Sequence, residues 1–274
     1  MHKYSTNVWG EVMRFKSSIS TIRLYIILLK DYSLIDVLLS LILPLLSVLF
    51  QIVFWKSVSI NVESLMGVSS QQILTYIFLA NILKYQFNIY TPATTSIWEG
   101  SIIRYYTKPM GIVRQLLLEV VGKQWIPQWL FFSVPTTLVM CIIGIPITPF
   151  DGIHFGAFLI SMMFSIIIGV EVDLIFAAIA VRLENGCWAA EQIRNALMIV
   201  LTGQVIPFQL LPEFIGKILT MLPFASIANT PISIYIGGDI FIRLVRQMIW
   251  SVFLGLLAYV LFLKSTERMI SNGG

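Results

Sequence analysis

Three ionisable side chains lie inside apolar runs long enough to cross a membrane. Lys84 falls in residues 71–91, and Glu171 and Asp173 fall in residues 154–181. A charge in hydrocarbon costs several kcal/mol unless it is paired or hydrated. The chemistry is therefore either an ion pair that fixes helix packing or a site for ions in a wet cavity. Because a helix rises about 1.5 Å per residue, the three groups lie at similar depths, and we expect Lys84 to pair with Glu171 or Asp173.

A polar stripe accompanies Lys84 on the same predicted helix. Asn81, Lys84, Tyr85 and Asn88 follow the spacing i, i+3, i+4, i+7 and so share one face. The stripe is a candidate wall of a hydrated cavity, and packing against a neighbouring helix is the alternative.

Catalytic motifs are missing from the sequence. Neither Gly122-Lys123 nor Gly216-Lys217 has the preceding glycine or the following Ser or Thr of a phosphate-binding loop. The two histidines, His2 and His154, are too few for a multi-histidine metal site or a convincing proteolytic dyad. We expect no enzyme activity, no catalytic residue, no metal and no cofactor in this chain.

The elements that must position these residues are membrane helices. The 274 residues are 57% hydrophobic and only 12% charged, where soluble domains are roughly a quarter charged. A span needs about 20 mostly apolar residues. The sequence predicts a single all-α integral membrane domain over 1–274 and no nucleic-acid binding, with six spans in the region 32–264: 33–55, 71–91, 124–145, 154–181, 193–211 and 242–263.

Charge predicts the orientation of these spans. Most Lys and Arg residues fall in segments on the side of the two termini, which places both termini, including the tail 265–274, in the cytoplasm. Arg243 and Arg246, at the opposite end of the last span, run against this rule. We expect a multi-pass membrane protein.

Two cytoplasmic segments have helical periodicity. In residues 1–31, apolar positions recur over 8–26 as in an amphipathic helix on the bilayer surface, with a simple basic anchor as the alternative. In the loop SIWEGSIIRYYTKP, Trp98, Ile102 and Tyr105 form one short apolar stripe. Two turns of helix are unstable alone in water, so this stripe must dock on a partner protein or on the membrane interface.

The fifth predicted span is interrupted by Gly203, Pro207 and Pro212. Proline removes a backbone donor and clashes with the preceding turn, and broken backbone survives at membrane depth only inside protein or beside a wet cavity. The following pieces, 213–222 and 224–235, are about half a span each. They predict a re-entrant outer hairpin before the last span, with Gln204 and Gln209 as polar groups at its mouth and Phe208 as an apolar gate.

These stretches resemble a known family, the permease subunits of type-2 ATP-binding cassette exporters. Glu99-Gly100-Ser101 followed by Lys108-Pro109 resembles the family's loop after the second span. The fifth span and hairpin resemble its second conserved region, and the ending STERMISNGG is similar to that of small bacterial permeases. The residues of this second region are Gly203, Pro207, Leu211, Pro212, Leu222, Pro223, Phe224, Pro231 and Gly237.

The resemblance implies a transport function in the bacterial plasma (inner) membrane, powered by another chain. Residues 97–106 would be a coupling helix docked on a separate ATPase that binds ATP and Mg, with contacts from Trp98, Glu99, Gly100, Ile102 and Tyr105. The segment 8–26 would be a connecting helix. The second and fifth spans would line the route with a second permease, expected to be a different chain, with a second copy as the alternative. The route residues would be Asn81, Tyr85, Asn88, Gln204, Phe208 and Gln209.

Two other functions fit the same composition. A stand-alone secondary transporter or channel would use buried charges for ion coupling and often has inverted repeats, and the two halves of this chain have no convincing repeat. An assembly subunit without transport of its own is the third possibility. Association with an ATPase would distinguish the ATPase-driven permease from a stand-alone secondary transporter or channel.

Overall fold

The computed structural model describes residues 18–24, 26–27, 32–66, 69–107, 110–144, 147–182 and 187–271, with their side chains other than those at 58–66, 97–98, 181–182, 187 and 263–271. This part of the chain is helical and contains no strand, as predicted. Of the amphipathic segment 8–26, only 18–24 and 26 are described, and they are helical.

The first half of the chain holds one long helix and several short ones. They are α2 (Leu34–Met66), α3 (Ser70–Ile82), α4 (Lys84–Phe87), α5 (Ala93–Trp98), α6 (Ile103–Tyr106), α7 (Ile112–Val120), the π-helical turn η2 (Val121–Trp125), α8 (Ile126–Gln128), the π-helical turn η3 (Trp129–Ser133) and α9 (Val134–Ile143). From α7 to α9 these pieces follow one another without a gap and form a single rod.

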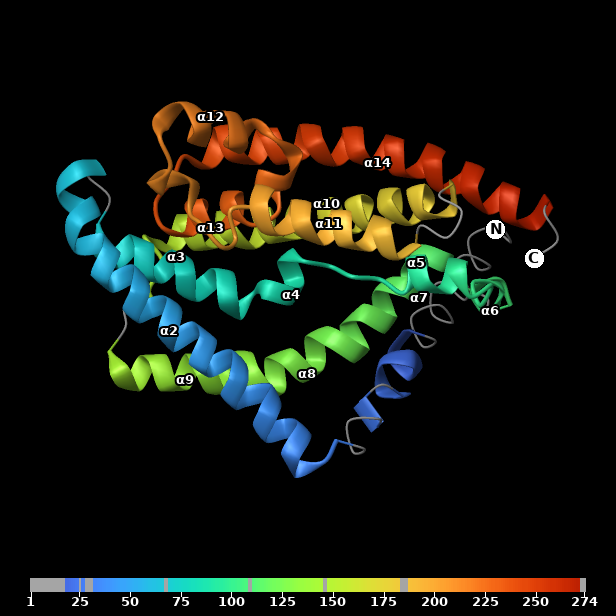
Figure 1. Cartoon of the computed structure of the whole chain (residues 1–274), viewed down its shortest axis with the longest axis horizontal. Helices are drawn as coiled ribbons and strands as arrows, with labels where there is room; N and C mark the ends of the chain where they lie inside the picture. The colour runs from blue at the N-terminus through green and yellow to red at the C-terminus, as the bar shows by residue number, and fades with distance from the viewer. Residues whose placement is uncertain are drawn as a thin grey trace, which may run out of the picture.

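The second half alternates long helices with short ones. They are α10 (Gly152–Arg182), α11 (Cys187–Leu201), the 3-10 turn η4 (Phe208–Leu210), α12 (Glu213–Met221), the 3-10 turn η5 (Pro223–Ser226), α13 (Asn229–Tyr235) and α14 (Ile240–Ser271). Figure 1 shows α12 and α13 at one end of the molecule and α5 and α6 at the other. We call these the α12–α13 end and the α5–α6 end.

Short polar side chains fix where the long helices begin. Ser33 and Asp36 exchange hydrogen bonds at the start of α2, where each backbone N–H donates to the other's side chain. Asp151 accepts from the His154 backbone N–H at 2.6 Å before α10, and Asp239 accepts from the Ile242 N–H at 2.8 Å before α14. These contacts satisfy N–H groups that a helix leaves unpaired in its first turn. The hydrogen bonds from His154 also keep the pKa of Asp151 below its ordinary value.

Four helical stretches in the described residues are long and apolar enough to cross a membrane. They are Leu34–Ser57, Ile112–Ile143, Gly152–Ala180 and Ile240–Phe262. The chain is therefore a multi-pass membrane protein, as the composition predicts. The third predicted span, 124–145, extends further toward the α5–α6 end than expected, because α7 continues into it through the π-helical turns.

The second and fifth predicted spans differ most from expectation. The second, 71–91, is not one helix: α3 ends at Ile82, α4 adds one turn, and the chain beyond Asn88 is not helical. The fifth, expected over 193–211, is displaced toward the N-terminus, since α11 begins at Cys187 and ends at Leu201. Gly203 has φ of 75°, a left-handed conformation that stops a helix. Both helices are shorter than the roughly 20 residues a simple span needs.

Helix α10 lies at the centre of the packing. It contacts α14 along much of its length and also contacts α5, α11 and α13, and Figure 1 shows α10, α11 and α14 running side by side. Buried apolar side chains form one cluster around α3, α10 and α13 and a second around α5, α7 and α10. The breaks themselves, at Leu83 and at Thr202–Gly203, are buried within the chain, as broken backbone at membrane depth requires.

Candidate functional site

The break in the second element exposes backbone carbonyls, and side chains of the α7–α9 rod satisfy them. The Ile82 carbonyl accepts from Gln128 Nε2 at 2.8 Å and from Ser133 Oγ at 3.0 Å. Gln124 Nε2 donates to the Tyr90 carbonyl at 2.7 Å. A buried carbonyl without a partner is costly, so these polar residues allow α3 to stop inside the protein.

The π-helical turns place those donors. Ile126 and Val134 each donate their N–H to a carbonyl five residues back, at Val121 and Trp129. Pro127 and Pro135 follow directly and have no N–H to donate. Gln124 and Ser133 lie within these wider turns and Gln128 lies between them. Single π turns of this kind often occur at functional sites.

A buried ion pair joins α10 to α11, and its partners differ from the expected ones. Arg194 Nε lies 3.3 Å from Asp173 Oδ1, and both side chains are almost fully buried. Arg194 Nη2 also donates to the Ile89 carbonyl and to Asn88 Oδ1, the latter at 3.2 Å. Asp173 Oδ2 accepts from the Thr91 N–H at 3.1 Å and from the Thr91 hydroxyl. The pair therefore holds the non-helical chain that leads from α4 to α5.

Lys84 does not take part in this pair, so the expected Lys84–Asp173 contact is wrong. Lys84 is exposed at the start of α4, and its side chain makes no ion pair or hydrogen bond with any residue that the structure describes. Glu171 does not pair with it either: its Oε2 is buried without a hydrogen-bond partner, and its Oε1 would lie 2.8 Å from a Cβ added at Gly255 of α14. Depth alone could not show that Arg194, at the very start of the fifth predicted span 193–211, reaches Asp173.

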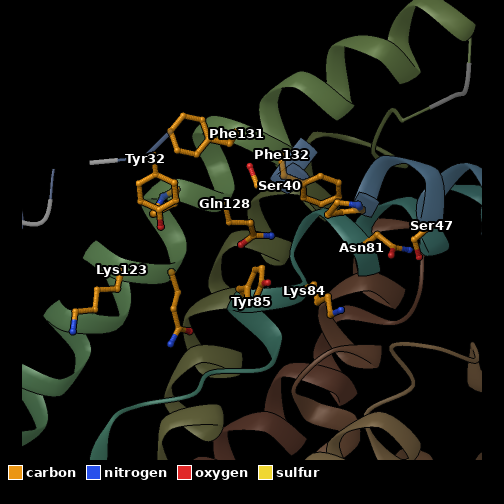
Figure 2. Close-up of a pocket in the computed structure, with 13 residues that line it drawn as sticks. Tyr32, Ser40, Ser47, Asn81, Lys84, Tyr85, Lys123, Gln128, Phe131 and Phe132 are labelled. Carbon is orange, nitrogen blue, oxygen red and sulfur yellow. The ribbon is translucent and has the colours of Figure 1, made fainter. Parts of the chain in front are cut away.

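A cavity of about 380 Å³ lies between α2, the α3–α4 break and the α7–α9 rod. Figure 2 shows Tyr85 and Gln128 near its centre, Lys84 beside Tyr85, and Tyr32 next to Phe131 at its edge. Two of the predicted route residues, Asn81 and Tyr85, line it. The full lining is Tyr32, Ser40, Pro44, Ser47, Asn81, Lys84, Tyr85, Lys123, Gln124, Pro127, Gln128, Phe131 and Phe132.

The other predicted route residues lie elsewhere. Asn88 accepts a hydrogen bond from Arg194, and Gln204 Nε2 donates to the Ala80 carbonyl at 3.1 Å. Phe208 and Gln209 line a second, more open cavity of about 500 Å³ at the α12–α13 end. The structure therefore divides the predicted route among two cavities and the backbone contacts between them.

Polar contacts also join the break in the fifth element to α3. The Tyr76 hydroxyl donates to the Gly203 carbonyl at 2.7 Å and contacts Asn229 Oδ1 at 3.2 Å. The Asn229 N–H donates to the Thr202 carbonyl at 3.0 Å. The side chains of Tyr76, Thr202 and Asn229 are buried. The middle of α3 thus meets the end of α11 and the start of α13, and the two broken elements are connected directly.

Arg246, one of the two cations that run against the charge rule, has a structural role. Its Nη1 donates to the Thr220 carbonyl at 2.6 Å, and Trp250 Nε1 donates to the Met221 carbonyl at 3.1 Å. These carbonyls end α12, where a cation is favourable. Gln247 Nε2 donates to the Ser226 carbonyl at 2.7 Å. One face of α14 therefore holds the short helices in place.

The α5–α6 segment differs from the single helix expected over 97–106. Gly100, with φ of 69°, separates α5 from α6. Ile102 and Tyr105, predicted to contact a partner, are instead 4% and 2% exposed within the chain. The Tyr105 hydroxyl donates to Glu119 Oε2 at 2.7 Å. Burial is the main cause that raises the pKa of Tyr105 above its ordinary value, so this hydroxyl stays protonated.

Ile102 and Tyr105 therefore hold the segment to α7, and other residues remain for a partner. Glu99 and Gly100, two of the predicted contacts, are exposed, as are Ile103 and Tyr106. The side chain of Trp98 lies outside the described residues. The usable surface, which we call the α5–α6 surface, consists of Glu99, Gly100, Ile103 and Tyr106.

Comparison with protein families matches residues 41–273 to the family described as ABC-2 family transporter protein. The chain belongs to this family. A comparison with curated proteins found no match. The match covers every helix from α3 to α14, so this ABC-2 family chain is the permease type that the sequence resembles. Family membership implies partnership with an ATP-binding cassette ATPase subunit.

Several functional features of this ABC-2 family permease escaped sequence reasoning. Periodicity found the polar stripe on α3 and α4, but it missed Arg194, which lies only seven residues after the start of α11. A signal was present, because Gln124, Gln128 and Ser133 are polar residues within an otherwise apolar span. Such residues in a membrane helix usually have a partner inside the protein.

Proposed function

We propose that this chain is the transmembrane permease subunit of an ABC exporter, in which a separate ATPase hydrolyses ATP and the route forms with a second permease. The observation that carries the proposal is the Arg194–Asp173 pair, because it connects the segment leading to α5 with α10 and α11. A movement imposed on the α5–α6 surface reaches both helices through these buried contacts. Lys84, Glu171 and the other ionisable groups then need no ion-coupling role.

The proposed arrangement has six membrane-crossing elements and a re-entrant hairpin. The four long stretches cross completely, α3–α4 and α11 with their non-helical continuations make the other two crossings, and α12 and α13 dip back from the outer side. The route follows Asn81, Tyr85 and Asn88 on the second element and Gln204, Phe208 and Gln209 on the fifth. The second element is buried within this chain, whereas α11 has an exposed apolar face at Ile193, Ile199 and Val200. This face of the fifth element contacts a second permease, for which we favour a different chain over a second copy. This orientation places the α5–α6 surface in the cytoplasm of a bacterium.

Cysteine labelling in whole cells tests the orientation. In a background with Cys141 and Cys187 changed to serine, Lys217→Cys on α12 should react with an impermeant maleimide from outside. Thr107→Cys, after α6, should react only after the cells are opened. Both positions are exposed, so accessibility to water decides the result. Labelling of Lys217→Cys only from inside would overturn the proposed topology.

The α5–α6 surface should bind the ATPase. Ile103→Glu should reduce, about tenfold or more, recovery of an ATP-hydrolysing cassette protein with the tagged chain, because burying one apolar side chain contributes roughly 1.5–3 kcal/mol. Phe214→Glu is the matched control, since Phe214 is also apolar and exposed but lies on α12 at the opposite end.

The result separates the permease from its alternatives. Equal recovery of the ATPase with both variants would place the contact elsewhere. Transport by the purified chain alone, with no ATPase present, would instead support a stand-alone secondary transporter or channel.

A further inference from the structure

Each wall of the cavity between α2, α3–α4 and the rod contains an interruption of regular α-helical hydrogen bonding. Pro44 lies inside α2 and has no N–H to donate, the second element breaks at Leu83, and the rod carries its π-helical turns there. Irregular backbone at membrane depth is tolerated where it lines a cavity. The coincidence of three such departures indicates a cavity built into the fold, and its volume lies within the range of small-molecule sites.

The cavity contains a cation without a counter-ion. No Asp or Glu is among the residues that line it. Its second cation, Lys123, pairs with Glu119 at 2.5 Å, whereas Lys84 has no ion-pair partner among the described residues. Lys84 lies 14 residues after the start of α3, about 21 Å along the helix axis. An unpaired ammonium at that depth is costly, and an anion bound beside it removes the cost.

The lining amides are largely used within the protein. Asn81 Nδ2 already donates to the Ile77 carbonyl at 2.8 Å and to Gln51. Gln128 donates to Ile82 and accepts from Gln86 Nε2 at 3.2 Å. The groups that remain to contact a ligand are therefore mainly Lys84 and the tyrosines.

Tyr85 supplies a second donor beside Lys84, and Tyr32 supplies another at the edge of the cavity. The hydroxyls of Tyr85 and Tyr32 make no hydrogen bond within the described residues. An ammonium and phenolic hydroxyls are donors suited to a carboxylate, phosphate or sulfonate oxygen. Of the described lining side chains, Gln124 contributes the single buried acceptor without a partner, its Oε1. The site therefore favours a ligand that brings negative charge.

The rest of the cavity is apolar. Tyr32 and Phe131 have ring centroids 5.6 Å apart at its edge, and Phe132, Pro44 and Pro127 add further apolar surface. We propose that this cavity binds one amphipathic anion, with its acidic group at Lys84 and Tyr85 and its apolar part against the Tyr32–Phe131 pair. Both an anionic phospholipid and a free amphipathic carboxylate have this chemistry.

Native mass spectrometry of the full chain in neutral detergent tests the site. The probes are phosphatidylglycerol and phosphatidylcholine with the same acyl chains, and oleate and oleyl alcohol. The wild type should bind one phosphatidylglycerol or one oleate in preference to the matched neutral lipid or alcohol. Lys84→Met should weaken this binding about tenfold or more, since a hydrogen bond to a charged group contributes about 1.5–3 kcal/mol. Lys84→Arg should keep most of it.

Two variants control for other effects. Lys217→Met removes one exposed cation outside the cavity and should leave binding unchanged. Tyr85→Phe should weaken binding without removing charge, and it replaces Lys84→Met if that variant does not elute as a single species on size exclusion.

The outcomes separate the two sources of the ligand. Preference for phosphatidylglycerol alone identifies a lipid site, preference for oleate alone identifies a site for a free amphiphile, and both together support the shared chemistry. Equal binding of anionic and neutral probes, or unchanged binding in both Lys84→Met and Tyr85→Phe, would overturn the proposal. The inference goes beyond the proposed function, because the assay contains no ATPase and its failure leaves the permease assignment intact.

Discussion

Arg194→Met should destabilise the protein strongly, far more than the loss of a charge from its surface. It leaves the Asp173 carboxylate buried with only its Thr91 contacts, and it removes the donor to the Ile89 carbonyl. Breaking a buried ion pair by removing one partner costs about 3–5 kcal/mol. We expect a large loss of monodisperse protein and a much lower melting temperature in detergent, followed by intrinsic fluorescence.

Two further variants isolate the cause. Adding Asp173→Asn to Arg194→Met should recover part of the stability, because the amide is neutral and its oxygen can still accept from Thr91. Lys217→Met removes one partner of the Lys217–Glu213 pair, which measures 2.5 Å but is largely exposed. Exposed pairs contribute about 0–1 kcal/mol, so this control should be almost neutral. Equal melting temperatures for Arg194→Met and Lys217→Met would contradict the prediction.

Gly203→Ala should have the next largest effect on stability. Gly203 has φ of 75°, and a left-handed conformation costs about 1–2 kcal/mol for other residues. A Cβ there would also lie 3.1 Å from Asn229 Cβ and the Tyr76 hydroxyl, and 3.2 Å from Phe208 Cε1. These neighbours are buried, and overpacking of a core typically costs about 1–3 kcal/mol more.

The same assay measures this change against a matched glycine. Gly156 of α10 has ordinary helical φ, and a Cβ there would meet nothing within 4 Å. Gly156→Ala should be neutral or slightly stabilising, because alanine favours helices by about 0.5–1 kcal/mol over glycine. If Gly203→Ala and Gly156→Ala have the same melting temperature, then the contact between the two broken elements is not rigid.

The sequence by itself determined the class of the protein and most of its long helices. Apolar length predicted the spans that became α2, the rod, α10 and α14, because in a bilayer each crossing element must satisfy its own backbone. The breakers Gly203 and Pro207 predicted that the fifth element could not be straight. All of these properties depend on residues that are close together in the sequence, so the sequence alone can predict them.

Only the tertiary structure decided which side chains meet. Periodicity found the stripe of Trp98, Ile102 and Tyr105 but could not tell that α7 would bury Ile102 and Tyr105, because an apolar face fits its own chain as well as a partner. Helix depth predicted that Lys84 would lie near Asp173, yet the Asp173 carboxylate pairs with Arg194. The reason is that α11 begins at Cys187, earlier than its apolar run indicates. Pairing inside a membrane depends on helix rotation and on where each helix breaks, and both are set by packing between elements distant in the sequence.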